Sequence, residues 1–286
     1  MKKRNFKTLL IGFAFSPNLK ANVFEATRLA YYFNAKLFFL HVGEKTKAKE
    51  NTFLDILKLP KESPEKIEIL WEKGDPVNAI LSACLRYKID LLLLGALKRE
   101  NVLKFYMGSI ARKITRKASC SVLLLIDPSI ERKPSQHAVV NAFESPQTEP
   151  TINAAFHFAS DLNINKITLV EEINRSEHDL DVYDDESLRR ATLKKEKIKR
   201  REHSRVNQIL KKIPKSYKDN IKIISQSIFG TRGYSIGHYA KLVRADVLIM
   251  NASETKKTFL SKFFPKDLDY ILRELPTNVL IIQNTN

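Results

Sequence analysis

Short, continuously apolar runs alternate with longer segments of mixed polarity in the first part of the chain. The runs lie at residues 8–15, 36–42, 66–74, 90–96 and 121–126. Apolar residues follow one another in these runs instead of alternating with polar ones, which is typical of strands in a parallel sheet that is covered on both faces. The pattern therefore predicts five strands of this kind.

The segments between the runs have the period of amphipathic helices. In residues 21–35 the buried stripe is expected to contain Val23, Ala26, Thr27, Ala30 and Tyr31. In residues 75–89 it is expected to contain Val77, Ile80, Leu81, Cys84 and Leu85. Asp75 is a favourable N-cap and Pro76 suits the first helical position. Strands that alternate with helices in this order predict a doubly wound α/β sandwich with right-handed crossovers.

The whole pattern occurs twice in the chain. Residues 67–96 align with residues 221–252, and this alignment pairs Gly74 with Gly230, Ile80 with Ile236, Asp90 with Asp246 and Gly95 with Asn251. Residues 9–17 match residues 139–146, and the apolar runs 121–126 and 278–283 are similar. A repeat of about 130 to 155 residues is much longer than a solenoid unit and indicates two domains. We expect one domain at residues 1–131 and a second at residues 135–286, each with a five-stranded parallel sheet.

Composition narrows the class of protein. A hydrophobic fraction of 43% is that of a folded chain. No apolar stretch reaches the roughly 20 residues that span a bilayer, and the first apolar run is short for a signal peptide, so we expect a cytoplasmic protein with no membrane partner. Cys84 and Cys120 have the spacing of neither a metal site nor a disulfide framework, and we expect them to be buried and reduced.

The candidate chemistry lies where the run 90–96 ends and the next helix begins. Ligands of open parallel sheets bind beyond the carboxyl ends of the strands. A helix that starts at Gly108-Ser109 would present unpaired N–H groups and a positive dipole end there. Its first turn contains no acid, and Arg112 and Lys113 add positive charge. These features favour a bound anion such as a phosphate.

The chain as a whole resembles a tandem universal stress protein. The resemblance rests on "FSPNLKANVFEATRLAYYFNAKLFFLHV", "GDPVNAILSACLRYKIDLLLLGA" and "MGSIARKITRKASCSVLLLI" in the first copy. Nucleotide-binding members of that family share Gly, two residues, Gly, nine residues, and Gly followed by Ser or Thr. Gly95 and Gly108-Ser109 match the ends of this signature, whereas Lys98 replaces the middle Gly. Ala14 and Ser121 stand where the family usually has an acid and a Pro.

The resemblance implies that ATP or another adenine nucleotide, with Mg²⁺, binds in the first domain. The implied site residues are Ala14, Val42, Gly95, Lys98, Gly108, Ser109 and Ile110. A glycine lets backbone approach a phosphate, and Lys98 in its place either supplies a cation or fills the space. Two interpretations therefore stay open, namely a working nucleotide site and an empty relic that is retained for packing.

The second copy departs further from the signature. Asn251 and, roughly, Pro265 stand at the positions of Gly95 and Gly108. Asp267 and Asp269 lie in the first turn of the following helix, where they would repel a phosphate. We expect no nucleotide in this copy. Asp90 and Asp246, which precede the fourth strand of each copy, are interpreted as solvated caps.

A basic insertion at about residues 174–218 lengthens the second copy. From Leu188 to Ile213 it reads as a long helix with a thin apolar stripe and Lys or Arg on its other faces. The net charge of +17 is spread over both copies, and no aromatic residues interleave the basic ones. We therefore disfavour nucleic acid and consider a protein partner, with a solvated helix as the plain alternative.

These observations predict a cytoplasmic stress-response protein that acts by binding. No Walker-type loop, nucleophile elbow or metal-spaced His pair occurs, so we expect no catalytic residue and no metal site. The first hypothesis is a nucleotide-responsive module; the second is a nucleotide-independent adaptor that uses its surface, including residues 188–213. Slow phosphate hydrolysis is a third and weaker hypothesis. The family resemblance further implies an intrachain pseudo-dimer with the runs 121–126 and 278–283 side by side, and it leaves a homodimer open.

Overall fold

A computed structural model describes residues 6–95, 97–98, 105–106, 108–174, 182–252 and 266–283, and for residues 97–98, 105–106 and 266–267 it describes the backbone alone. The chain divides into two compact units. The first unit comprises residues 1–135 and 272–286, and the second comprises residues 136–271. Each unit is a mostly parallel α/β structure, as the alternation of apolar runs and amphipathic segments predicts.

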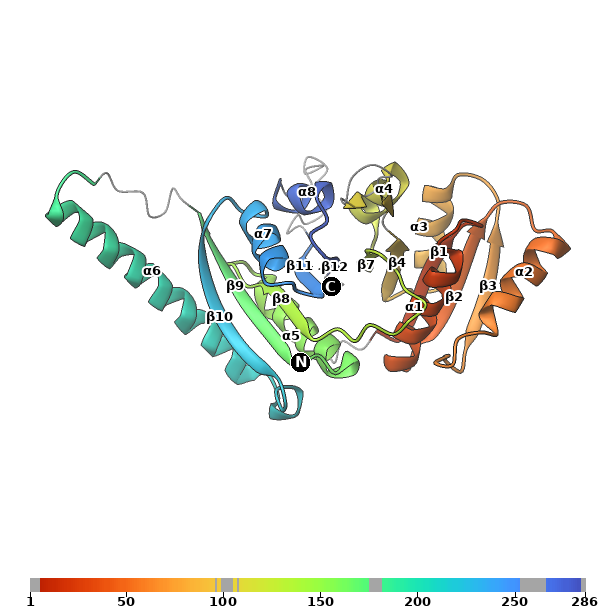
Figure 1. The fold of residues 1–286 in the computed structure, drawn as a ribbon, viewed down its shortest axis with the longest axis horizontal. Coiled ribbons are helices and arrows are strands. Elements are labelled where there is room, and N and C mark those ends of the chain that lie inside the picture. The colour runs from red at the N-terminus through yellow and green to blue at the C-terminus, as the bar shows by residue number, and fades with distance from the viewer. Residues whose placement is uncertain are drawn as a thin grey trace. The chain divides into compact units, whose positions relative to one another are not determined.

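The sheet of the first unit has the strand order β12-β7-β4-β1-β2-β3 (Figure 1). Its strands are β1 (Thr8–Phe13), β2 (Lys36–Val42), β3 (Ile67–Glu72), β4 (Leu91–Gly95), β7 (Ser121–Leu125) and β12 (Asn278–Ile282). The first five coincide with the five apolar runs and pair in parallel. In β4 and β7 the side chains on both faces of the sheet are buried, which explains why apolar and polar residues do not alternate in these two runs.

Helices connect these strands. They are α1 (Leu19–Tyr32), α2 (Lys47–Leu57), α3 (Pro76–Arg86) and α4 (Ser109–Lys117), and a short hairpin of β5 (Leu97–Lys98) and β6 (Phe105–Tyr106) precedes α4. Asp75 caps α3 as predicted, because its carboxylate accepts the Asn78 N–H at 2.9 Å. The expected stripe of α3 is wrong at Leu85, which is 67% exposed. The expected stripe of α1 is also wrong at one position. Tyr31 is 51% exposed, and Leu29 on the opposite border of the stripe is buried instead.

The second unit contains four parallel strands in the order β10-β9-β8-β11. They are β8 (His137–Asn141), β9 (Lys166–Asn174), β10 (Lys222–Gly230) and β11 (Val247–Asn251). Its helical segments are α5 (Thr148–Leu162), α6 (Asp185–Lys212), η2 (Lys215–Tyr217), α7 (Tyr234–Leu242) and α8 (Lys266–Arg273). The long basic insertion is therefore a helix, and it begins three residues before the predicted Leu188 because Asp184 and Ser187 form a capping box.

The last strand, β12, is grouped differently from the sequence-based division of the chain. The sequence predicts five parallel strands in each domain and places residues 278–283 in the second domain at 135–286. Instead, β12 belongs to the first unit and runs antiparallel to β7, which leaves four described strands in the second unit. Both strands are almost entirely buried and apolar, and their pairing covers the edge that β7 would otherwise expose. The expectation that residues 121–126 and 278–283 lie side by side is confirmed.

One polar contact recurs in both units. Asp90 Oδ2 accepts the N–H groups of Lys7 and Thr8 at 3.0 Å each, and Asp246 Oδ2 accepts those of Gln136 and His137 at 2.7 and 2.8 Å. Each aspartate precedes the fourth strand of its unit and ties that strand to the start of the first. Asp90 is exposed, as a solvated cap would be, but both acids also join two strands, which the interpretation from the sequence does not include.

Three further observations concern the described part of the chain. None of its helices combines the length and the apolar character that crossing a bilayer requires. No group of three or more His, Cys, Asp or Glu side chains in it is arranged to hold a metal ion. Cys84 and Cys120 are free and buried, as the sequence predicts.

Candidate functional site

The strand order of the first unit reverses between β1 and β4. The chain proceeds from β1 outward to β2 and β3, and then returns to build β4 and β7 on the other side. Such a reversal opens a crevice at the carboxyl ends of the strands, where ligands of open α/β sheets bind. Because each connecting helix runs back against the parallel strands, the start of α4 lies at this same edge. The topology thus brings Ala14, Val42, Gly95 and Gly108 to one edge of the sheet.

Gly95, the last residue of β4, lies against the side chain of Asn22 from α1. A Cβ atom at Gly95 would lie 3.3 Å from Asn22 Oδ1, which is closer than side chains normally approach. Asn22 Oδ1 is buried and has no hydrogen-bond partner in the structure. A carboxamide with an unused oxygen beside a bare backbone is a polar group that a ligand could satisfy. Sequence analysis missed Asn22; its only signal is a polar residue in the first turn of the helix that follows β1.

The start of α4 offers donors for an anion. Gly108 is the N-cap and supplies no side-chain cap, and the first turn contains no acid. Ser109 and Ile110 are exposed, and N–H groups in this first turn have no partner within the helix. Arg112 lies in the same turn, and its buried Nε has no hydrogen-bond partner in the structure. The helix start and this guanidinium together could bind a phosphate or a carboxylate.

The segment between the two glycines is partly described. Leu97 pairs with Tyr106 and Lys98 pairs with Phe105 in the antiparallel hairpin. The sequence predicts that Lys98 either supplies a cation to a phosphate or fills the space of the missing glycine. Its side chain lies outside the described residues, so both interpretations remain predictions.

An aromatic cluster borders Ala14 and Val42. Ala14 is exposed in a tight turn after β1, where its carbonyl accepts the Ser16 N–H at 2.9 Å. Val42 is half-buried and pairs with Glu72 in β3. The preceding residue of β3, Trp71, is the only tryptophan in the chain. It stacks with Phe15, with ring centroids 6.4 Å apart, and Phe15 keeps 36% of its surface exposed.

His41 lies at the centre of this cluster. Its ring centroid is 5.1 Å from those of Phe15 and Trp71, and its Nδ1 lies 3.1 Å from the Phe13 carbonyl oxygen. If Nδ1 donates to that carbonyl, the ring is held in a fixed orientation between its aromatic neighbours. His41 is therefore a packing residue of the cluster, and the exposed face of Phe15 is the part that a planar ligand could contact.

The corresponding edge of the second unit is filled by the protein's own groups. Lys36 and Lys166 begin β2 and β9, and counting from them places Glu172 at the position of Val42. The Glu172 carboxylate accepts the N–H groups of Gly233 and Ile236 at 2.8 and 3.0 Å, so an internal anion occupies the start of α7. Phe143, at the position of Ala14, has the Arg232 guanidinium 4.7 Å from its ring centroid.

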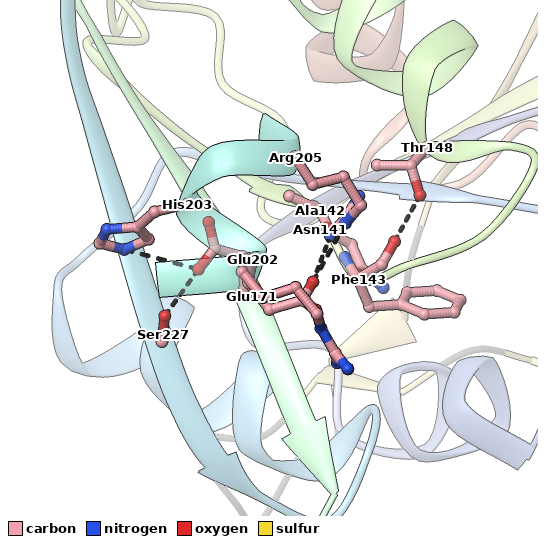
Figure 2. Close-up of polar contacts among 10 residues, drawn as sticks. Asn141, Ala142, Phe143, Thr148, Glu171, Glu202, His203, Arg205 and Ser227 are labelled. Carbon is pink, nitrogen blue, oxygen red and sulfur yellow. Dashed lines mark hydrogen bonds and ion pairs between the residues drawn. The ribbon is translucent and has the colours of Figure 1, made fainter. Parts of the chain in front are cut away.

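Helix α6 reaches the same edge through a second set of contacts (Figure 2). Arg205 Nη2 donates to the Ala142 carbonyl oxygen at 2.5 Å and to Glu202 at 2.8 Å. Thr148 Oγ1 donates to the Phe143 carbonyl oxygen. The backbone acceptors that follow β8 are therefore already in use.

A buried carboxylate lies beside these contacts. Glu171 Oε2 accepts a hydrogen bond from Ser227 Oγ at 2.6 Å and lies 3.5 Å from Nε2 of His203 on α6 (Figure 2). Burial raises the pKa of Glu171, and the contacts with Ser227 and His203 oppose that effect. Nothing in the sequence marks Glu171 as a buried carboxylate, because a pair of Glu residues near the end of a strand is normally exposed.

The remaining predicted features of the second unit lie near α8. Asn251 ends β11, in agreement with its alignment to Gly95. Pro265 and the side chain of Asp267 lie outside the described residues. Asp269 lies in the first turn of α8, which is described from Lys266 onward.

Comparison with known proteins places a universal stress protein domain in the chain. Residues 43–125 match the model of the universal stress protein family. A Thermus aquaticus protein described as a universal stress protein in the QAH/OAS sulfhydrylase 3′ region is 29% identical over 135 residues, which cover 42% of this chain and 98% of that protein.

Solved structures share the fold over nearly the whole chain. A functionally unknown protein from Pseudomonas aeruginosa PAO1 matches with a TM-score of 0.70 at 14% identity and covers 97% of this chain and 92% of its own. A universal stress protein from Archaeoglobus fulgidus matches with a TM-score of 0.62 at 12% identity and covers 98% of each chain. At such identities the likeness concerns the fold alone.

Proposed function

We propose that the first unit binds ATP or another adenine nucleotide at the edge between β1 and β4. The N–H groups of Ser109 and Ile110 and the Arg112 guanidinium would hold the phosphates, with Gly95 and Gly108 leaving room for their approach. Ala14 and Val42 would border the base and the sugar. Lys98, on the intervening segment, would add a cation.

The observation that carries this proposal is the pair of unused buried groups at this edge. Asn22 Oδ1 and Arg112 Nε are both buried and both lack a hydrogen-bond partner in the structure. Leaving a buried polar group unsatisfied costs about 1–3 kcal/mol. Unpartnered buried atoms also occur in the second unit, at Glu171 and Arg232, so the proposal rests on their combination here with Gly95 and the uncapped start of α4. Asn22 Oδ1 is an acceptor and the Arg112 guanidinium is a cationic donor, which suits a ligand that has both a hydrogen-bond donor and an anionic part.

The second unit would bind no nucleotide. At the positions of Ala14 and Val42 it carries Phe143 and Glu172, and both side chains are engaged within the unit. A carboxylate at the second position would also repel phosphates. In the first unit Ala14 replaces the family's usual acid, so Mg²⁺ would enter with the phosphates and not through a protein carboxylate.

Thermal unfolding with and without millimolar ATP and Mg²⁺ tests the proposal. Ligand at about 100 times its dissociation constant should add roughly 2.7 kcal/mol, which raises the Tm by about 5–10 °C for a domain of this size. Trp71 fluorescence gives a second readout, because this single tryptophan lies beside the proposed base position. Gly108→Asp should abolish both changes by placing a carboxylate at the helix start.

The matched control is Ser119→Asp. It adds the same charge just beyond the other end of α4, at an exposed residue, and should leave the ATP response intact. Equal responses in wild type and Gly108→Asp, or no response in wild type, would exclude the proposed site and favour a relic that is retained for packing.

A second function rests on a different observation. Helix α6 contains eleven Lys or Arg residues and four Asp or Glu residues, and most of its basic side chains are exposed. This surface favours a nucleotide-independent adaptor that binds a partner through α6. The two proposed functions are separable, because the proposed nucleotide site would lie in the first unit and α6 belongs to the second.

A further inference from the structure

Helix α6 is anchored to the second unit by its C-terminal half. Val206 and Ile209 are buried against the unit, and Glu202 and Arg205 take part in the contacts described above. Lys212 Nζ adds an ion pair with Glu149 of α5 at 2.6 Å. These contacts fix the orientation of the helix, so the polar residues on its adjacent face have defined positions.

A groove of about 740 Å³ runs between this part of α6 and the start of β10. Helix α6 lies alongside β10 in Figure 1, and the two elements are in contact. On the helix side the groove is lined by Arg200, Asn207, Gln208 and Lys211, and across from them lie Lys218 and Ile223. None of the described residues that line the groove is acidic. The groove therefore favours a ligand with negative charge.

The spacing of its cations sets the length of that ligand. Arg200 and Lys211 are eleven positions apart on one helix, which corresponds to about 16 Å along the axis. An extended peptide advances about 3.3 Å per residue, so this distance corresponds to about five residues. Two carboxylates separated by four or five residues would reach both cations at once.

The residues between the two cations suit a peptide backbone. Asn207 and Gln208 offer carboxamides that can both donate to carbonyl groups and accept from N–H groups. Leu210 and Ile223 supply an apolar surface on which a side chain can pack. Next to them, β10 is the outermost of the described strands of the second unit and pairs among these with β9 alone, so its outer edge offers backbone groups to an added strand.

We propose that this groove binds an acidic, extended segment of a protein partner, with carboxylates four to five residues apart and an apolar residue between them. Nucleic acid fits less well, because single strands are normally held by stacking on several aromatic side chains, and the described lining residues include no Phe, Tyr or Trp and a single His, His203. This inference rests on the proposed adaptor function of α6 and names the kind of partner that α6 would bind. It does not depend on nucleotide binding by the first unit.

Fluorescence anisotropy with a labelled peptide tests the inference. The probe has two glutamates, four uncharged residues including a central valine, and two glutamates, and a second probe has glutamine in place of every glutamate. The full chain should bind the acidic probe more tightly than the neutral one at about 0.15 M salt. Arg200→Glu combined with Lys211→Glu should weaken binding at least about tenfold, since both ends of the ligand lose a charge partner.

The matched control reverses two charges elsewhere on the same helix. Arg189→Glu combined with Lys197→Glu makes the same change in net charge at exposed residues outside the groove lining, and it should change affinity by less than about threefold. Helicity measured by circular dichroism verifies that both variants are folded. Gly108→Asp should bind the probe as wild type does, so failure of the nucleotide proposal leaves this outcome unaffected.

Three results would overturn the inference. They are the absence of binding by wild type, equal losses in the two double variants, and equal affinity for the acidic and neutral probes. A labelled oligonucleotide that outcompetes the acidic probe and loses affinity only in the groove variant would assign the groove to nucleic acid instead.

Discussion

Phe53 is the only buried residue of α2, and the packing of this helix on the first unit depends on it. Its side chain is 0% exposed and stacks on Phe13, with ring centroids 4.3 Å apart and planes inclined by 15°, and it meets Phe39 at 5.1 Å. Phe53→Ala removes a whole ring from this contact and leaves a cavity. Replacements of this kind cost about 3–5 kcal/mol. We expect the free energy of unfolding to fall by an amount in that range. The fall cannot exceed the free energy required to detach α2 from the rest of the unit.

Urea denaturation followed by Trp71 fluorescence measures this loss. Trp71 belongs to the same aromatic cluster, since its ring centroid lies 6.4 Å from that of Phe13, so its emission reports on the unit that is perturbed. With a slope of about 2–3 kcal/mol per molar urea, the midpoint should fall by about 1–2 M. Leu54→Ala, on the same helix but 37% exposed, is the control and should cost less than about 1 kcal/mol.

The two ways in which the helix can respond are distinguishable. If α2 detaches before the unit unfolds, the slope of the transition decreases together with its midpoint, because less surface remains to be exposed. If the cavity is retained, the midpoint falls at an unchanged slope. A loss below about 1.5 kcal/mol at an unchanged slope would refute the argument that one ring anchors this helix.

Three other predictions concern stability and reactivity. Asp90→Ala and Asp246→Ala should each destabilise the unit in which the substitution lies by about 1–3 kcal/mol, because each removes two hydrogen bonds to backbone N–H groups. Scanning calorimetry should show similar losses of stability for the two variants. A loss in one variant only would contradict the equivalence of the two aspartates. Burial raises the pKa of Glu171 above its ordinary value of 4.5. The stabilisation that this shift provides is complete below pH 4.5 and is lost as pH rises through the raised pKa. The urea midpoint should therefore fall less between about pH 5 and pH 8 in Glu171→Gln than in wild type. A hydrogen bond with Cys120 and burial raise the pKa of Cys84, and both thiols are buried. Neither thiol should therefore react with Ellman's reagent before the protein unfolds. Rapid reaction of two thiols in the native protein would contradict their burial.

Local patterns in the sequence account for most of the elements. The continuous apolar runs are strands, and Asp75 with Pro76 begins a helix where the capping preferences place it. These features depend on neighbours within one or two turns, which a single sequence displays directly. The position of β12 depends on a partner strand about 150 residues away, so its apolar character identifies a strand but not the unit to which the strand belongs.

The candidate site is predictable to a smaller extent. The spacing of Gly95 and Gly108 directs attention to the correct edge of the sheet, because backbone requirements leave a mark in the sequence. Asn22, by contrast, comes to lie beside Gly95 only through the packing of α1 on the sheet. The filled edge of the second unit is likewise invisible in the sequence, since Glu172 meets the start of α7 about 60 residues later.

The return of β12 to the first unit has a consequence for biosynthesis. A ribosome that adds about 5–20 residues per second needs roughly 8–30 s to proceed from β7 to β12. During that interval the nascent first unit exposes the apolar, hydrogen-bonding edge of β7, while the entire second unit is still being made. The chain must therefore be protected from association with neighbouring polypeptides until translation is nearly finished, and variants that delay the docking of β12 should aggregate during synthesis even when the finished protein is stable.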